Sequence, residues 1–387
     1  MQKQAARNPE QFSHARAVSD ATAIAAGRRP ALASLPRRAF LGGGMASAAA
    51  LLAGCGAEAV SVSLDSGPLH LTYLDADKGN PGWPAGPSDF RSRLYAPTQV
   101  VRLGTRWFIV DCWHHRIIHS EDLYLPIARW HTLDENIAGP HSIATDGHFF
   151  VAEDTGRHGV KVYRQPAPGV FEQAQYLPNI GRRPHRVLFD AARRQFLIVG
   201  SEDQTLYILR EQAGALVLAA AVHVPELQGQ YCRSITLQGD TLWFVGNFHL
   251  VRYRMTPQGV VPDTGHITLH ARFHGSNDLY FFENGTGGIL TSTPRSAVRF
   301  RVLDDLALGT ATDLAQGTSS GAFSGTPYYV TRMPSGMLLI PEHSDSSSAI
   351  RVYPLAAQGF DHSLAQTIVD FGQSAQVSIE RKRLLPT

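Results

Sequence analysis

Short apolar runs separated by polar turns repeat along the chain from Tyr95 onward. Each repeat starts with a short polar pair, enters an apolar strand, turns on Gly, Asp or Asn, and continues into a stronger apolar strand that ends in polar residues. A third strand tends to alternate and is expected to face solvent on one side. Second strands are predicted at 107–110, 149–152, 196–199, 242–245, 288–291 and 337–340.

The starts of the first strands give the length of the repeat. They align at Pro97-Thr98, Pro140-His141, Pro184-His185, Cys232-Arg233, Ser276-Asn277 and Pro327-Tyr328, in steps of 43, 44, 48, 44 and 51 residues. A unit of about 45 residues with three or four strands is the size of a β-propeller blade. Helical solenoids of similar period would need a 3.6-residue apolar periodicity, which is absent. The sequence therefore predicts an all-β fold, a six-bladed β-propeller.

The propeller is predicted to span residues 95–375, followed by a C-terminal tail at 376–387. Its sixth blade can be completed from either terminus, by the strand at 367–371 or by an early strand at 70–74. We expect both to take part.

The six units resemble the six-bladed propellers of the NHL-repeat, strictosidine-synthase and gluconolactonase type. The resemblance covers the whole mature chain as a pattern of strands, and no diagnostic catalytic motif accompanies it. It implies that the start of each innermost strand and the loop after each second strand lie on one face, around the central channel. Propellers of this kind serve as binding modules, lactonases, lyases and scaffolds, so the fold alone does not settle the function.

The beginning of the chain has the features of an export signal. Arg37 and Arg38, a following hydrophobic pair and a weakly apolar run ending at Leu52-Ala53-Gly54-Cys55 match a bacterial twin-arginine signal joined to a lipoprotein cleavage site. An ordinary signal peptide with a chance cysteine is the alternative. The apolar run is shorter than the roughly 20 residues that a membrane-spanning helix needs. We expect removal of residues 1–54, lipidation of Cys55, and a linker at 55–94.

Composition narrows the partners and the location. Charged residues make up 18% of the chain and the net charge is +2, which gives no reason to expect nucleic acid as a partner. The expected partners are a membrane, through the lipid on Cys55, and a small molecule or protein. The expected location is the periplasmic side of a bacterial membrane, and Gly56 after the cysteine favours the outer membrane. Cys112 and Cys232 remain, and we expect buried thiols rather than a disulfide.

Polar residues recur on the face that the resemblance places around the channel. The first-strand positions are Thr98, His141, His185, Arg233, Asn277 and Tyr328, with Arg186 and Asp278 beside them. The second-strand ends supply Asp111, Glu153, Asp154, Glu202, Asn247, Ser292, Glu342 and His343. These residues form the predicted site.

His141 and His185 occupy equivalent positions in neighbouring units, and they are the most specific candidate pair in the predicted site. With Glu153, and with His343 as a further ligand, they are candidates to hold a divalent metal, since zinc accepts nitrogen and oxygen ligands. The alternative is that both histidines are structural. Gluconolactonase sites resemble a carboxylate and two amides around calcium, whereas this ring is richer in His and Arg. The cofactor therefore stays open, with a divalent metal as the candidate.

The same ring suits an anionic or polyhydroxylated ligand, because guanidinium groups offer donors matched to carboxylate or phosphate. Arg186, Glu202, Asn247, Asn277 and Asp278 are the candidate ligand-binding residues. The alternative is that the arginines only balance nearby carboxylates.

Two functions follow from this ring. The first is a lipid-anchored propeller that binds a ligand or a protein at the channel face without chemistry. The second is a metal-dependent, lactonase-like hydrolase or a lyase, in which Arg233 or Tyr328 stabilises developing negative charge. Whether the protein is an enzyme stays open between them.

Overall fold

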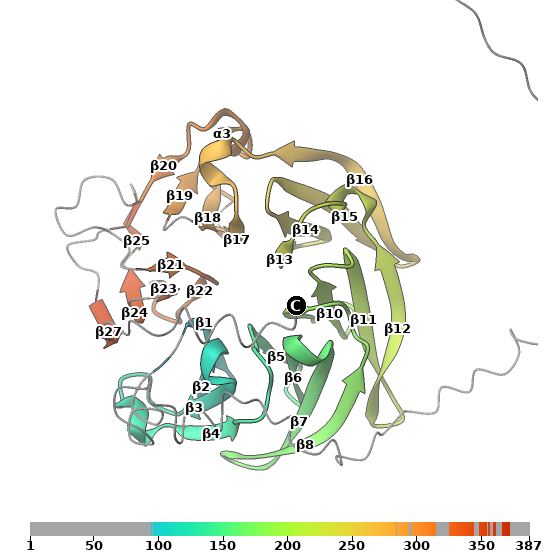
Figure 1. The fold of residues 1–387 in the computed structure, drawn as a ribbon, viewed down its shortest axis with the longest axis vertical. Helices are drawn as coiled ribbons and strands as arrows, with labels where there is room; N and C mark the ends of the chain where they lie inside the picture. The colour runs from blue at the N-terminus through green and yellow to red at the C-terminus, as the bar shows by residue number, and fades with distance from the viewer. Residues whose placement is uncertain are drawn as a thin grey trace, which may run out of the picture. The chain divides into compact units, whose positions relative to one another are not determined.

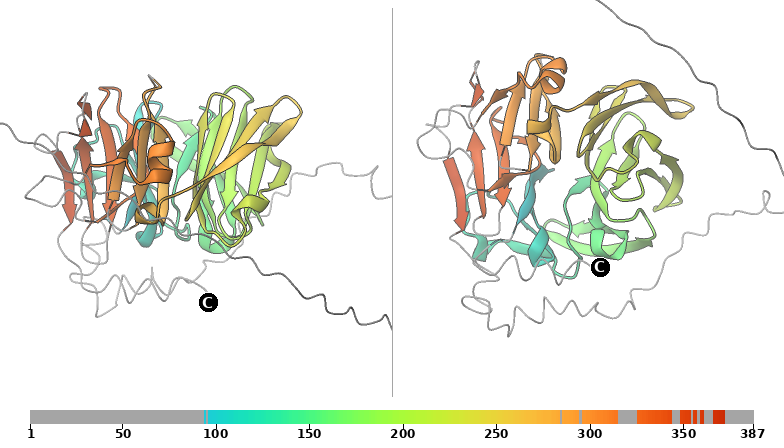
Figure 2. Two further views of the ribbon diagram at one scale, coloured as in Figure 1. Left: turned by 90° about the horizontal axis from the view of Figure 1, so that it is seen from above. Right: turned by 45° about the horizontal axis from the view of Figure 1, so that its top comes forward.

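A computed structural model describes residue 94 and residues 96–371, apart from 284, 294–295, 315–324, 344–347, 354, 357–358 and 361–365. The predicted export and lipidation residues Arg37, Arg38 and Cys55 lie outside the described residues, as do the proposed segments 1–54 and 376–387. Six sheets stand around a central axis (Figure 1), and their strands run between the two faces of the ring (Figure 2). The predicted six-bladed β-propeller is confirmed.

The first three sheets each have four antiparallel strands, with the first strand innermost (Figure 1). The strands are β1 (Pro97–Leu103), β2 (Arg106–Asp111), β3 (Arg116–Ser120), β4 (His131–Asp134); β5 (Ile143–Thr145), β6 (Phe149–Asp154), β7 (Gly159–Ala167), β8 (Val170–Pro178); and β9 (Pro184–Asp190), β10 (Gln195–Gly200), β11 (Thr205–Gln212), β12 (Ala215–His223).

The last three sheets repeat this arrangement with a variation at the end. Their strands are β13 (Cys232–Gln238), β14 (Thr241–Gly246), β15 (His249–Thr256), β16 (Gly259–Thr268); β17 (Ser276–Phe281), β18 (Gly288–Ser292), β19 (Ser296–Phe300), β20 (Thr312–Asp313); and β21 (Thr326–Pro327), β22 (Thr331–Arg332), β23 (Leu338–His343), β24 (Ser348–Tyr353), β27 (Gln366–Phe371). β25 (Leu355–Ala356) and β26 (Gly359–Phe360) pair with each other in a separate two-stranded sheet.

Within the part of the chain that the structure describes, helices lie in the connections between strands. The α-helix α3 (Asp304–Leu308) follows β19, and 3-10 turns lie at η1 (Cys112–His114), η2 (Ile127–Arg129), η3 (Thr155–Arg157), η4 (Pro225–Leu227) and η5 (Ala271–Phe273). No helix among the described residues is long and apolar enough to cross a membrane.

The predicted strand starts are confirmed in four sheets and differ in two. β5 begins only at Ile143, so His141 precedes the strand. In the sixth sheet the innermost strand is interrupted after Pro327. There the N–H of Tyr329 donates to the carbonyl of Thr98 at 3.2 Å, and the N–H of Val330 donates to Asp278 Oδ2 at 2.9 Å. These bonds leave the sheet ladder, which explains the break.

The ring closes between the first and the sixth sheets. β27 pairs with β24, so the C-terminal strand completes the sixth blade as predicted; the early strand predicted at 70–74 lies outside the described residues. A buried apolar cluster unites Val100 and Ile109 of the first sheet with Leu339 and Ile350 of the sixth. Because apolar burial contributes roughly 25 cal/mol per Å², side-chain packing stabilises this junction.

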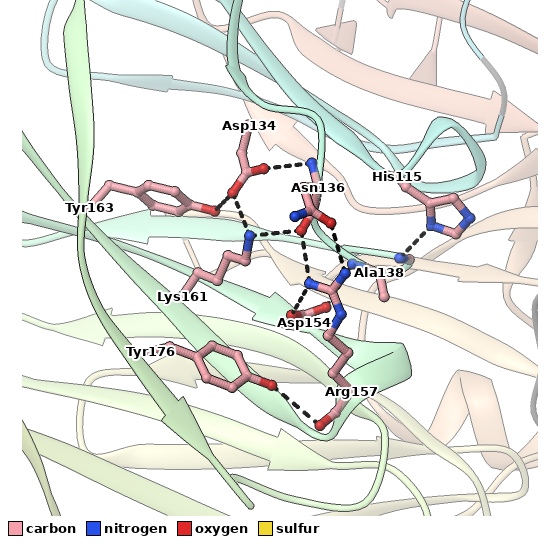
Figure 3. Close-up of polar contacts among 10 residues, drawn as sticks. His115, Asp134, Asn136, Ala138, Asp154, Arg157, Lys161, Tyr163 and Tyr176 are labelled. Carbon is pink, nitrogen blue, oxygen red and sulfur yellow. Dashed lines mark hydrogen bonds and ion pairs between the residues drawn. The ribbon is translucent and has the colours of Figure 1, made fainter. Parts of the chain in front are cut away.

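Polar side chains add a second kind of contact between neighbouring blades, shown for the first two in Figure 3. Arg157 donates to the backbone oxygen of Asn136 at 2.9 Å and to Asp154 Oδ2 at 3.1 Å. Asp134 accepts from Lys161 at 2.8 Å and from the hydroxyl of Tyr163 at 2.7 Å. Asp154, predicted to lie on the channel rim, therefore contributes to this junction between blades.

Candidate functional site at the channel mouth

A bulge at the start of four innermost strands explains why polar residues point toward the axis. In β9, Pro184 pairs with Gly200 and Arg186 pairs with Val199, which leaves His185 as the extra residue. The same shift in β1, β13 and β17 leaves Thr98, Arg233 and Asn277 as the extra residues. A bulge re-aims the side chain that it carries. Four of the six predicted first-strand positions, Thr98, His185, Arg233 and Asn277, are therefore equivalent in backbone geometry.

Histidine and tyrosine side chains from the second, third and sixth blades meet where the blades converge. The rings of His141 and His185 have centroids 3.5 Å apart. His185 Nε2 lies 2.7 Å from the hydroxyl of Tyr328, and His185 Nδ1 lies 3.4 Å from that of Tyr231. The structure thus brings together three of the predicted residues and adds Tyr231.

His185 is held neutral in this cluster. Burial, followed by the neighbouring His141, lowers the pKa of His185 well below its ordinary value. Burial also raises the pKa of Tyr328, so its hydroxyl keeps the proton. A neutral imidazole accepts at one nitrogen and donates at the other. The hydrogen bond between the Tyr328 hydroxyl and His185 Nε2 therefore joins two neutral groups, and its direction follows the tautomer of the imidazole.

Tyr328 and Tyr329 carry the sixth blade across the channel. The hydroxyl oxygen of Tyr329 lies 2.7 Å from the carbonyl oxygens of His185 and of Arg233, which share its single proton as acceptors. His185 belongs to the third sheet and Arg233 to the fourth, on the far side of the axis (Figure 1). Tyr328 and Tyr329 are 5% and 0% exposed. The pair therefore links opposite sides of the ring.

Three arginines surround these aromatic rings. The guanidinium carbon of Arg186 lies 3.9 Å from the ring centroid of Tyr329. Those of Arg233 and Arg183 lie 5.0 and 5.8 Å from the ring of Tyr231, within the range of a cation–π interaction. The mouth of the channel is therefore rich in positive charge.

The predicted carboxylate and amide near these arginines are only partly available to a ligand. Glu202 Oε1 lies 3.6 Å from Arg183 Nε, and Glu202 Oε2 lies 3.5 Å from Arg182 Nη2. The carboxylate of Glu202 therefore balances part of the positive charge of these two arginines. Asn247 accepts a short hydrogen bond from Arg233 through its side-chain oxygen.

Other predicted site residues serve contacts between blades. Asn277 donates to the carbonyl of Pro327 at 3.0 Å, and Asp278 accepts from Ser234 Oγ at 2.7 Å. Within the second blade, Glu153 accepts from the backbone N–H and the hydroxyl of Ser142, and Ser142 Oγ accepts from the N–H of Val187 in the third blade. Burial raises the pKa of Glu153 to about 7.

Metal binding is the part of the predicted site with least support. Within the described residues, no three His, Cys, Asp or Glu side chains gather as metal ligands. The side chain of His343 lies outside that description. His141 Nδ1 lies 3.2 Å from Thr155 Oγ1, and His141 Nε2 lies 3.6 Å from Cys112 Sγ. The metal site stays a prediction.

Sequence reasoning did not single out Tyr231, Tyr329 or Arg183. Tyr231 and Tyr329 directly flank the predicted strand starts at Cys232-Arg233 and Pro327-Tyr328. Aromatic residues at the edge of a repeated strand start were the available signal. Arg183 directly precedes Pro184-His185 in the same way.

Comparison with known proteins defines the fold and nothing finer. No protein-family model and no curated protein matches the chain. Among solved structures, a Bacteroides fragilis protein provisionally assigned as a 6-phosphogluconolactonase is 15% identical, with a TM-score of 0.50 over 72% of this chain and 85% of that one. The periplasmic gluconolactonase PpgL of Pseudomonas aeruginosa is 14% identical, with a TM-score of 0.50 over 72% and 86%. Streptogramin B lyase is 12% identical, with a TM-score of 0.46 over 70% and 82%. The two structures with a TM-score of 0.50 are thus similar to this chain in fold alone.

Proposed function

We propose that this protein is a lipid-anchored, extracytoplasmic propeller that binds a small anionic ligand at the mouth of its channel. Arg233 carries the proposal. Its guanidinium is half-buried, stacks on Tyr231 and donates to the amide oxygen of Asn247. No carboxylate among the described residues forms an ion pair with it. An arginine held in place by an aromatic ring and an amide is pre-organised to receive an oxyanion.

The surroundings of Arg233 favour the same class of ligand. The guanidinium of Arg183 also lies over the ring of Tyr231, which places a second positive charge near Arg233. Tyrosine offers an apolar face with a hydroxyl at its end, which suits a sugar acid or another polyhydroxylated anion. A protein partner with an exposed acidic side chain is the other occupant of this kind.

Calorimetric titration of the purified mature protein tests this function. The panel contains gluconate, 6-phosphogluconate, glucuronate and citrate, with glucose as the uncharged control. We expect saturable binding of an anion but not of glucose. Arg233→Gln should weaken that binding roughly tenfold or more, because a charge-assisted bond is lost.

Arg254→Gln is the matched control for this titration. Arg254 is exposed on β15 and pairs with Asp263 at 3.3 Å. Its substitution should leave binding unchanged. Failure of every anion to bind the wild type would contradict the proposal.

The anchor is tested separately by fractionation of cells that express the full chain. Cys55→Ala should move the protein from the membrane fraction to the soluble periplasmic fraction, because the acyl chains supply the membrane affinity. Replacement of Arg37 and Arg38 by lysine should block export. Membrane association that survives Cys55→Ala would contradict lipidation at this residue.

The metal-dependent hydrolase or lyase remains the second candidate, on the close approach of His141 and His185. Elemental analysis of natively exported protein decides it, with the His141→Ala, His185→Ala double variant for comparison. Stoichiometric metal that disappears in the variant would favour the enzyme and justify assays with lactones and esters. Metal-free wild-type protein would remove this candidate.

A further inference from the structure

Arg186 has a cationic head inside the channel with no hydrogen-bond acceptor among the described residues. It follows the bulge of β9 and is 8% exposed. Its Nε and Nη1 atoms are buried without a partner. Its described contact is the ring of Tyr329, at 3.9 Å, which comes from the opposite blade. The side chain therefore extends toward the axis of the ring.

The neighbouring groups do not supply the missing acceptors. Glu153 and Asp278 are the carboxyl groups that act on this region, and Tyr328 and Tyr329 are its other titratable groups. Glu153 already accepts two bonds from Ser142, and Asp278 accepts from Ser234 Oγ and the N–H of Val330. These carboxyl groups balance charge at a distance. A buried donor without an acceptor is costly, so an acceptor from outside the described chain is favoured.

The geometry of the guanidinium selects the kind of acceptor. The ring of Tyr329 covers one face of Arg186. Nε and Nη1 lie on different edges of the guanidinium, and Nη2 completes each edge. The two parallel N–H groups of one edge match two oxygens of one carboxylate or phosphate. A single spherical anion would meet fewer of these donors.

We infer that Arg186 is the oxyanion subsite of the channel and binds the carboxylate or phosphate group of the ligand. This inference rests on the proposed function and deepens it. One charged group of the ligand enters the channel at Arg186. The rest of the ligand, including the oxyanion that Arg233 receives, lies at the mouth beside Tyr231.

Thermal denaturation with small anions tests the subsite without knowledge of the ligand. The mature protein is heated in sodium formate, sodium phosphate or sodium chloride at equal ionic strength. We expect formate or phosphate, at about tenfold excess over its dissociation constant, to raise Tm by roughly 2–4 °C relative to chloride. An equal response to chloride would overturn the assignment of an oxyanion site.

Variants at Arg186 locate the response. Arg186→Gln should abolish it, and Arg186→Lys should largely abolish it, because lysine keeps the charge but lacks the fork. Arg254→Gln is the control and should respond as the wild type does. A full formate response in folded Arg186→Gln would overturn the inference.

A direct binding measurement covers the case in which the variants do not fold. Equilibrium dialysis of radiolabelled formate against wild-type protein should give saturable binding of one equivalent. Its absence would overturn the subsite.

The outcomes also separate this inference from the proposed function. Gluconate binding that is unchanged in Arg186→Gln leaves the mouth site standing without the subsite. Formate binding at Arg186 without binding of any panel ligand leaves the subsite standing alone.

Discussion

Glu153 and His115 are both buried beside junctions between blades, and burial acts on them in opposite directions. It raises the pKa of Glu153 to about 7, because the charged form is the carboxylate. It lowers the pKa of His115 to about 3, because the charged form is the imidazolium. Both shifts change how stability varies with pH.

Glu153→Gln should flatten the pH dependence of stability on the neutral side. The pKa of Glu153 lies above its ordinary value of 4.5. The contribution of protonated Glu153 to the free energy of unfolding is therefore complete below pH 4.5 and is lost as the pH rises through 7. Between about pH 5 and about pH 8 the wild type should lose roughly 2–3 kcal/mol more than the variant. Urea denaturation at several pH values measures this, with exposed Glu172→Gln as the control. Parallel profiles would contradict it.

His115→Asn should have its effect on the acid side. His115 Nδ1 accepts from the N–H of Gly139 at 2.8 Å, a bond that an asparagine oxygen can also accept. Asparagine tolerates the φ of 54° at this position. The contribution of neutral His115 is complete above 6.5 and is lost as the pH falls toward 3.

Between about pH 6.5 and about pH 4.5 the variant should therefore lose about 2 kcal/mol less than the wild type. The same denaturation series measures it, and exposed His148→Asn should match the wild type. A variant profile as steep as that of the wild type would show that His115 does not titrate with unfolding.

The close approach of neighbouring strands in the fifth blade requires a glycine in β18. Gly288 begins β18, where a Cβ atom would collide with the carbonyl oxygen of Tyr280 and the ring of Phe300. Neither group can move without shifting β17 or β19. The glycine is required by this close approach between strands.

Gly288→Ala should therefore destabilise the protein by about 2–4 kcal/mol. Guanidinium denaturation measures the change. Thr312→Ala, exposed on β20 of the same sheet, should cost under about 0.5 kcal/mol. A loss as small as that of the control would mean that the sheet adapts to the extra methyl group.

The pattern of apolar runs predicted these strands well because each depends on its own residues. Second strands at 107–110 and 242–245 lie within β2 and β14, and four first strands start at the predicted residue. The break after Pro327 depends on Thr98 and Asp278, which belong to other blades. A local pattern cannot report contacts of this kind.

The whole ring places side chains from distant blades together, and here prediction from sequence reached its limit. Equivalent positions in the repeat predicted His141, His185, Arg233 and Tyr328 around one channel, and the structure brings the side chains of His141, His185 and Tyr328 together. The repeat could not say that Tyr328 meets His185 or that Tyr329 reaches the backbone of Arg233. Those contacts depend on the width of the channel, which no single blade determines.

Tyr329→Phe tests the link across the ring. The variant keeps the ring that contacts Arg186 and removes the donor to two carbonyl oxygens. Those carbonyls lose a buried partner, so the free energy of unfolding should fall by about 1–3 kcal/mol. Chemical denaturation measures it, with Tyr124→Phe, 58% exposed, as a control that should be neutral. A neutral Tyr329→Phe would mean that packing alone holds the last blade in place.

Each described sheet draws its strands from one continuous stretch of chain, and the first and last sheets meet by packing. The order of the blades around the ring is therefore independent of where the chain begins. A circular permutant that joins the end of β27 to the start of β1 and opens between β12 and β13 keeps every sheet whole. By the same logic, duplication or deletion of the gene segment that encodes one blade would change the number of blades without dividing a sheet.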